Sequence, residues 1–199
     1  HDIPLIEDDV YSDLYFTESR PKPAQLYSEK GLVMTCSSFS KTAAPGYRVG
    51  WLIPGKYEEQ AKRIKRAQSC STPMLQQWTL TEYLMSGEYD RHLQVLRKKL
   101  IYNCERMRAL IAENFPPEVC ISRPQGGSVL WVRCRSHVDT SRLFEPAIAK
   151  GVSFAPGVVF SPSGKYSNYM RISFGVQWCE RIEQAIKVLG ELVRESQEN

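Results

Sequence analysis

The chain has no long apolar run, few histidines and no closely paired cysteines. No apolar stretch approaches the ~20 residues that a membrane-spanning helix needs. The three histidines do not cluster, and none of the six cysteines belongs to a Cys-x-x-Cys pair, so we predict no metal site. Scattered cysteines in a chain of 199 residues are typical of reduced, mostly buried thiols, which favours a cytoplasmic protein.

The sequence also lacks a dense block of one charge. Its net charge is +4, and 42% of its residues are hydrophobic and 24% charged, as is usual for a globular protein. The two most basic segments, 62–68 and 96–100, have helical spacing and apolar neighbours. They favour solvated helix faces over a nucleic-acid surface. Residues 1–11 have too short an apolar part, and too many acids, for a signal peptide.

Apolar periodicity and turn residues predict an α/β chain in two regions. The expected strands are 3–11, 31–39, 47–54, 119–124, 128–134 and 168–175, and the expected helices are 56–67, 73–87, 88–114, 139–150 and 177–195. Residues 1–90 form the first region, with buried strands, and residues 91–199 form a compact α+β unit. Three strands are few for a sheet covered on both faces, so we expect the chain to begin inside a domain.

One lysine, Lys41 in "SSFSKTAAPGYRVGW", has small and hydroxylated neighbours instead of other charges. It follows a predicted strand, where α/β folds place their ligands. A lysine becomes a nucleophile when burial or a nearby cation lowers its pKa. Ser38, Ser40 and Thr42 offer donors for a phosphate or oxyanion, and Arg48 can grip the same phosphate. An exposed lysine in a turn is the alternative interpretation.

Two further residues follow the first predicted strand. Asp8 lies at its end, and Tyr11 comes three residues later. A buried carboxylate needs a partner, and a protonated pyridine nitrogen is one, with the phenol reaching the same ring. An acid, a phenol and a lysine at neighbouring strand ends suit a Schiff-base cofactor with a pyridinium nitrogen. The alternative is an Asp that caps a helix and a Tyr that packs in the core.

Arg171 interrupts an apolar strand in "NYMRISFG". Buried arginines are rare unless they are paired. The functional interpretation is a clamp for the carboxylate of a substrate. An internal salt bridge explains the pattern equally well.

Together these motifs resemble the fold-type I pyridoxal-phosphate enzymes, the aspartate aminotransferase superfamily. The resemblance covers the whole chain. It implies the C-terminal part of that α/β fold, with part of the large-domain sheet over 1–90 and the small α+β domain over 91–199.

The same resemblance implies roles for individual residues. Lys41 would form the Schiff base, Asp8 would pair with the pyridine nitrogen, Tyr11 would contact the 3-hydroxyl group, and Arg171 would hold the substrate's α-carboxylate. The implied cofactor-binding residues are Asp8, Tyr11, Ser38, Ser40, Lys41 and Arg48. Pyridoxal 5'-phosphate is the implied cofactor.

The segments "PLIEDDVYSDL", "GYRVGWLIPG", "STPMLQQ" and "RPQGGSVLWV" are most similar to the effector domain of MocR-type regulators in the GntR superfamily. That resemblance implies a homodimeric, ligand-sensing region, which binds an amino acid or 2-oxo acid and contacts DNA only through an N-terminal winged helix-turn-helix domain. A free-standing aminotransferase of the aminoadipate or kynurenine type is the alternative. A degenerate fold without cofactor is a third reading.

One part of the family pattern has no counterpart in these residues. The family's N-terminal half supplies a glycine-rich phosphate turn, an aromatic ring that stacks on the cofactor, and an asparagine. We therefore expect half of a cofactor pocket here, and no transamination by this chain alone. Any DNA-binding domain is expected upstream of it.

Overall fold

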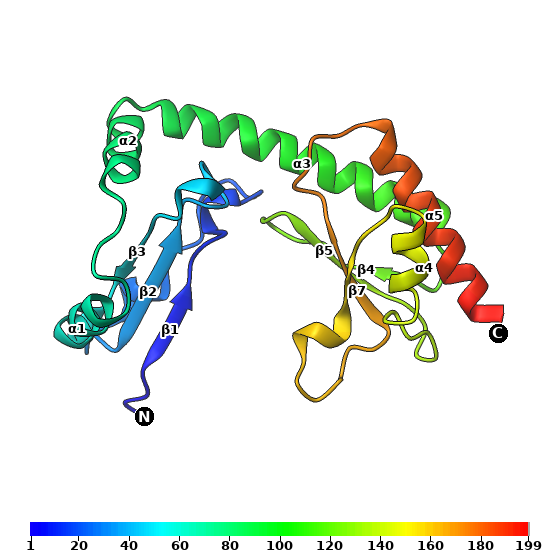
Figure 1. The fold of residues 1–199 in the computed structure, drawn as a ribbon, viewed down its shortest axis with the longest axis horizontal. Helices are drawn as coiled ribbons and strands as arrows, with labels where there is room; N and C mark the ends of the chain where they lie inside the picture. Colours follow the sequence, from blue (N-terminus) through cyan, green and yellow to red (C-terminus); the bar gives the residue numbers. More distant parts are fainter. Residues whose placement is uncertain (199) are drawn as a thin grey trace. The chain divides into compact units, whose positions relative to one another are not determined.

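The computed structural model describes residues 1–198, and the side chains of residues 1–196. These residues form two compact units, one from His1 to Arg97 and the other from Lys98 onward (Figure 1). The division falls inside the long helix α3 (Glu88–Asn114). The first part of α3 therefore belongs to the first unit and the rest to the second.

The first unit contains a three-stranded sheet in the order β1-β2-β3. Its strands are β1 (Leu5–Asp8), β2 (Val33–Ser38) and β3 (Gly50–Ile53). Strand β1 runs parallel to β2, with Asp8 opposite Cys36, and β3 runs antiparallel to β2. The carboxyl ends of β1 and β2 therefore meet at one edge of the sheet.

The expectation that these strands are buried is wrong for the two outer strands within this chain. Ile6 of β1 is 69% exposed, and all four residues of β3 are exposed. An apolar strand is buried only where other elements cover it, and the described residues leave these two strands largely uncovered. Buried side chains instead gather where the loop after β2 meets the helices, among them Val49, Leu80 and Leu93.

Helices α1 (Glu58–Ser69) and α2 (Met74–Met85) connect this sheet to α3, close to the predicted ranges. Gly87 separates α2 from α3 with φ 73°, a backbone angle that favours glycine. Helix α3 ends at the predicted residue, Asn114, two residues before Pro116-Pro117. Proline cannot continue the helical hydrogen-bond pattern, which fixes this end.

The second unit contains a four-stranded antiparallel sheet in the order β4-β5-β7-β6. Its strands are β4 (Cys120–Ile121), β5 (Val129–Arg133), β6 (Ala155–Pro156) and β7 (Tyr169–Ser173). Buried and exposed residues alternate along β7, so one face of the sheet packs on the core. Strand β6 lies at the edge, where Pro156 is tolerated.

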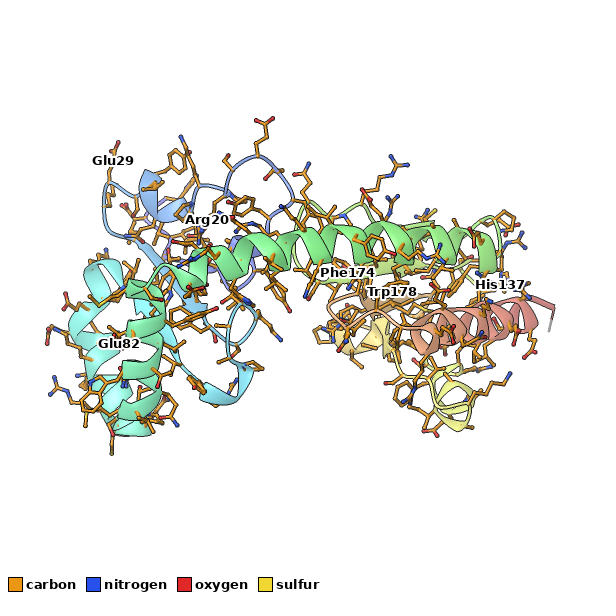
Figure 2. All side chains as sticks on the ribbon, turned by 90° about the horizontal axis from the view of Figure 1, so that it is seen from above. Arg20, Glu29, Glu82, His137, Phe174 and Trp178 are labelled. Carbon is orange, nitrogen blue, oxygen red and sulfur yellow. The ribbon has the colours of Figure 1, made fainter. Side chains whose placement is uncertain are left out.

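Helix α5 (Glu180–Glu198) packs against the second part of α3 over this sheet (Figures 1 and 2). Arg106 of α3 pairs with Glu183 of α5 at 3.0 Å. A Cβ atom at Gly190 would lie 2.2 Å from the Asn114 carbonyl oxygen, so only glycine permits the helices to approach this closely. Leu100, Cys104, Met107 and Ile111, spaced three or four residues apart on α3, are buried in this core.

Two predicted elements are shorter than expected. The helix predicted over 139–150 is α4 (Phe144–Ala149), because Thr140 is fully buried and its hydroxyl donates to the carbonyls of Ser167 and Tyr169. The strand predicted over 119–124 shortens to β4, after which one more backbone bond joins the Ser122 N–H to the Trp131 carbonyl at 3.0 Å.

Candidate functional site

The ends of β1 and β2 hold most of the predicted site residues. The backbone N–H of Asp9 donates to the Cys36 carbonyl at 2.8 Å, and the Ser37 hydroxyl donates to the Asp9 carbonyl at 3.2 Å. These bonds fix the two strand ends side by side. The loop after β1 carries Tyr11, and the loop after β2 carries Lys41.

Ser38, Ser40 and Arg48 form one hydrogen-bonded cluster. The Ser38 hydroxyl donates to Ser40 Oγ at 2.9 Å, and Arg48 Nη1 donates to the same Oγ at 3.1 Å. The Ser40 backbone N–H donates to Ser38 Oγ at 3.1 Å. Arg48 has φ 55° and ψ 38°, a left-handed conformation that is uncommon for a residue with a Cβ atom. This backbone angle turns the chain back into β3.

Lys41 lies beside this cluster and beside Tyr11. Its side chain is exposed, and its Nζ atom lies 5.9 Å from the centre of the Tyr11 ring. This distance is within the range of a cation–π contact. Neither Lys41 nor Arg48 has an acidic partner among the residues that the structure describes. Arg48 and two hydroxyls therefore gather here, Lys41 follows Ser40 directly in the chain, and neither cation has an ion pair among the described residues.

Asp8 is exposed, so the expectation of a buried carboxylate is wrong for this chain. Its Oδ1 atom accepts a bond from the Val10 N–H at 3.1 Å, a local turn rather than a helix cap. The neighbouring Asp9 is the buried acid, 4% exposed. Alternation along a strand places adjacent side chains on opposite sides, and the sequence "EDD" does not reveal which acid points outward.

A polar network that no sequence motif indicates joins the two loops. Arg20 pairs with Asp9 and, at 2.7 Å, with Asp13. The Tyr89 hydroxyl donates to Thr42 Oγ1 at 2.9 Å and lies 3.3 Å from Asp13 Oδ2. The chain of contacts runs from the residue after Asp8 to the residue after Lys41. Its members lie far apart in the sequence, so no local motif could have indicated it.

Helix α3 anchors the lysine loop through this network. His92 Nε2 lies 2.8 Å from the Thr42 carbonyl oxygen, and the Phe39 ring meets the Tyr89 ring edge to face at 6.0 Å. Thr42 is 3% exposed. Burial raises the pKa of the Tyr89 hydroxyl to about 12. Thr42 is therefore a buried anchor of the lysine loop, and its hydroxyl is less accessible than its position beside Lys41 suggests.

Tyr89→Phe is expected to lower the free energy of unfolding by about 1 kcal/mol, because it leaves the Thr42 hydroxyl with one buried bond fewer. Urea unfolding of the full-length protein measures the change. Tyr27→Phe is the matched control, since Tyr27 is 72% exposed in the same unit. Equal stability of the two variants would contradict the role given to the network.

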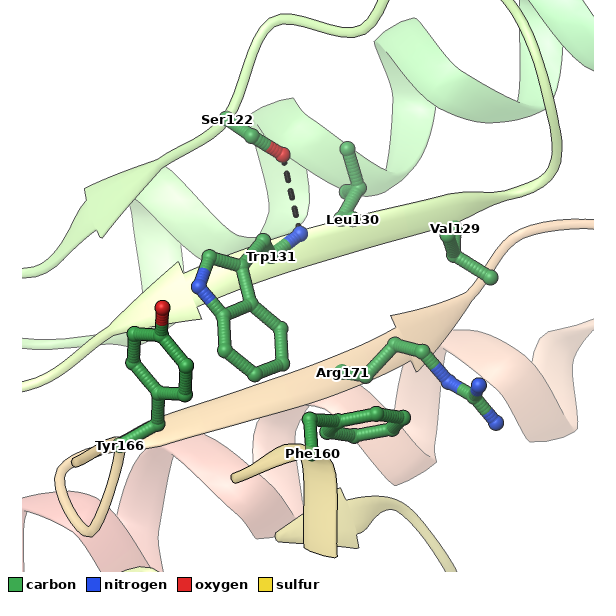
Figure 3. A pocket seen from close by; sticks show the side chains of 7 residues that line it. All are labelled: Ser122, Val129, Leu130, Trp131, Phe160, Tyr166 and Arg171. Carbon is green, nitrogen blue, oxygen red and sulfur yellow. Dashed lines mark hydrogen bonds between the residues drawn. The ribbon is translucent and has the colours of Figure 1, made fainter. Parts of the chain in front are cut away.

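Arg171 lies in the second unit, on β7, and it is exposed, so the expectation of a buried arginine is wrong. The strand alternates, and Arg171 points away from the core face that Met170 and Ile172 occupy. Its guanidinium lies 5.0 Å from the centre of the Phe160 ring (Figure 3). No carboxylate within the described part of the chain pairs with it, which removes the internal salt bridge as an explanation.

The cysteines form no disulfide bonds in the described residues. All six cysteines are free, and Cys70, Cys120 and Cys179 are exposed, so the expectation of mostly buried thiols is wrong for half of them. Burial raises the pKa of the Cys134 thiol to about 12.

Residues 1–198 contain no cluster of His, Cys, Asp and Glu placed to hold a metal ion. No helix among them is both long and apolar enough to cross a membrane.

Comparison with known sequences gives two kinds of relative. The HTH-type transcriptional regulators YdcR and YjiR of Escherichia coli are 37% and 36% identical to this chain over 98% and 100% of its length. Aromatic-amino-acid aminotransferase 1 of Thermococcus litoralis is 29% identical over 98% of it. The chain spans 42% of the length of each of the two regulators and 47% of the aminotransferase.

Solved aminotransferases have the same fold over this length. The multiple substrate aminotransferase of Thermococcus profundus matches 99% of the chain, and 49% of its own, with a TM-score of 0.91 and 27% identity. The α-aminoadipate aminotransferase LysN of Thermus thermophilus, solved with a phosphopyridoxyl-leucine, matches 98% of the chain, and 51% of its own, with a TM-score of 0.91 and 27% identity.

The fold is thus part of the aspartate aminotransferase-like α/β fold, as the sequence predicts. The family model described as aminotransferase class I and II matches residues 1–189. The chain therefore belongs to the class I and II aminotransferase family, whose cofactor is pyridoxal phosphate.

Proposed function

We propose that the strand-end cluster of the first unit binds pyridoxal phosphate. The observation that carries this proposal is the group of Lys41, Arg48, Ser38 and Ser40, which brings two cations and two hydroxyls together with no acid to neutralise them. Such a group fits a phosphate, because charged hydrogen bonds to an anion are the strongest that these side chains form.

Each residue near the cluster has a defined task in this proposal. Arg48, Ser38 and Ser40 hold the phosphate. Lys41 would supply the amine that holds the cofactor, and the same amine would act as the general base toward the substrate.

Two residues of the loop after β1 act on the cofactor ring. Asp8, exposed and without an ion pair in the described chain, keeps a ring nitrogen protonated. The Tyr11 phenol, under the Lys41 ammonium, contacts the 3-hydroxyl group. The cofactor itself supplies the electron sink for breaking a bond at the α-carbon of an amino acid.

In the second unit, Arg171 is proposed to hold the α-carboxylate of an amino acid or a 2-oxo acid. Its guanidinium rests on Phe160 and has no carboxylate partner among the described residues, so its N–H groups stay available to a ligand. A planar guanidinium binds a carboxylate through two parallel hydrogen bonds.

For the whole protein we propose a transcriptional regulator of the MocR type, in which this domain senses the ligand. The sequence identities favour this reading. The identity of this chain to YdcR and YjiR is higher than its identity to the Thermococcus litoralis enzyme, by 8 and 7 percentage points (37 − 29 and 36 − 29). A free-standing aminotransferase remains the second candidate, since LysN has the same fold over this length. Homodimerisation and a cytoplasmic location, to which the six free thiols are suited, belong to the same proposal.

The full-length protein distinguishes the two candidates. A regulator is expected to bind its own promoter DNA, with an affinity that changes at least fivefold when the ligand amino acid is added, as a mobility-shift titration would measure. It should release little 2-oxo acid in the same buffer. Rapid transamination without DNA binding would contradict the regulator and support the enzyme.

A further inference from the structure

The second unit contains an open pocket of about 360 Å³ on the exposed face of its sheet (Figure 3). We call it the aromatic pocket. Its lining residues are Ser122, Val129, Leu130, Trp131, Phe160, Tyr166 and Arg171. Its volume is within the range of sites for small ligands.

Trp131 is the centre of this pocket. Its indole meets the rings of Phe160 and Tyr166 edge to face, at centroid distances of 5.4 and 5.6 Å, and stacks on Tyr169 at 5.3 Å. Figure 3 shows Trp131 with Tyr166 on one side and Phe160 on the other. Phe160 and Tyr166 keep 42% and 38% of their surface exposed, so part of each side chain stays open to a ligand.

Arg171 gives this aromatic pocket a group that can bind a carboxylate. It lies directly opposite Trp131 in the pairing of β7 with β5, and its guanidinium rests on the Phe160 ring. An aromatic ring attracts a cation that lies over it, and no carboxylate among the described residues pairs with the N–H groups of Arg171. Phe160 thus orients the group that binds the carboxylate.

The pocket has a single charged residue, Arg171, and its other lining residues are apolar or neutral. A dicarboxylate would place its second negative charge among aromatic rings without a cation, at a large cost of desolvation. A short aliphatic acid would leave the edge-to-face positions around Trp131 unfilled.

We propose that the aromatic pocket selects carboxylates that carry an aromatic ring, so that the ligand of this domain is an aromatic amino acid or its 2-oxo acid. The inference rests on the carboxylate role proposed for Arg171. Trp131 and Phe160 are the residues that determine specificity.

Two acids without an amino group test this selectivity in the full-length protein. Isothermal titration with 3-phenylpropionate and with butyrate reports binding at Arg171 that needs no covalent step at Lys41. We expect 3-phenylpropionate to bind at least tenfold more tightly than butyrate, because its ring becomes buried against Trp131. Arg171→Gln is expected to weaken both acids at least tenfold.

Trp131→Leu is expected to weaken 3-phenylpropionate about fivefold or more and to leave butyrate unchanged. Trp178→Leu is the matched control, since Trp178 lies in the same unit and outside the pocket lining. If Trp131→Leu fails to fold, Phe160→Leu gives the same test at a more exposed ring.

Three results would overturn the inference: equal affinity for the two acids, no binding of either acid because another segment covers the pocket, or ring selectivity that survives Trp131→Leu and Phe160→Leu. The proposed cofactor site is tested separately at Lys41. Ring selectivity without a cofactor band would contradict that site alone, and a cofactor band without ring selectivity would contradict this inference alone.

Discussion

Replacing Lys41 by alanine is expected to abolish covalent binding of the cofactor. Full-length protein reconstituted with pyridoxal phosphate should have a visible absorbance band that borohydride reduces, with a covalent adduct on the chain. The Lys41→Ala protein should lose both. The reason is geometric, because Lys41 is the lysine at the strand-end cluster, next to Ser40 and over the Tyr11 ring.

Lys56→Ala is a matched control for this experiment. Lys56 also lies over a tyrosine ring, with its Nζ atom 5.5 Å from the centre of Tyr57, and it belongs to the same unit. It takes no part in the hydrogen bonds that join Ser38, Ser40 and Arg48, and Lys56→Ala should keep the band at full strength. A reducible band of equal strength in Lys41→Ala would disprove the assignment of the Schiff-base lysine.

The second large effect is expected at Arg48. Arg48→Gln removes the cation and the charged hydrogen bonds to the phosphate. Such bonds contribute about 1.5–3 kcal/mol each, so we expect pyridoxal phosphate to bind roughly 100-fold more weakly. Equilibrium dialysis of the cofactor against the full-length protein measures this constant.

Arg63→Gln is the control for charge alone, because Arg63 lies on α1 in the same unit and no ion pair is found for it in the described chain. Its cofactor affinity should stay within twofold of the unchanged protein. An Arg48→Gln protein with similarly unchanged affinity would remove Arg48 from the site, and the phosphate would then need another cation.

Much of the site could be predicted because its signal is local. Ser38, Ser40, Lys41 and Arg48 lie within eleven residues, and the hydrogen bonds among the two serines and Arg48 join positions two and eight residues apart. Helical periodicity and the Pro116-Pro117 pair are also local signals, so the sequence predicts that α3 ends at about Asn114, as it does.

The Thr42, Tyr89 and Asp13 network could not be predicted, because Tyr89 is 47 residues from Thr42 and 76 from Asp13. Only the packing of α3 on the strand-end loops brings these side chains together. The position of a tyrosine on an amphipathic helix does not predict which hydroxyl group its own hydroxyl will bind.

The burial of individual side chains does not follow from the sequence pattern. Apolar neighbours suggested that Asp8 and Arg171 were buried, but both side chains are exposed. Along a strand the side chains alternate between two faces, and whether a face is covered depends on elements distant in the chain.

By itself, then, the sequence determined the elements, the family and the group of residues at the end of β2, because these depend on local spacing and turn chemistry. Only the tertiary structure decided which acid faces outward, what anchors the lysine loop, and that Arg171 lies beside exposed aromatic rings. These features depend on contacts between strands and helices that are far apart in the chain, and no local pattern specifies them.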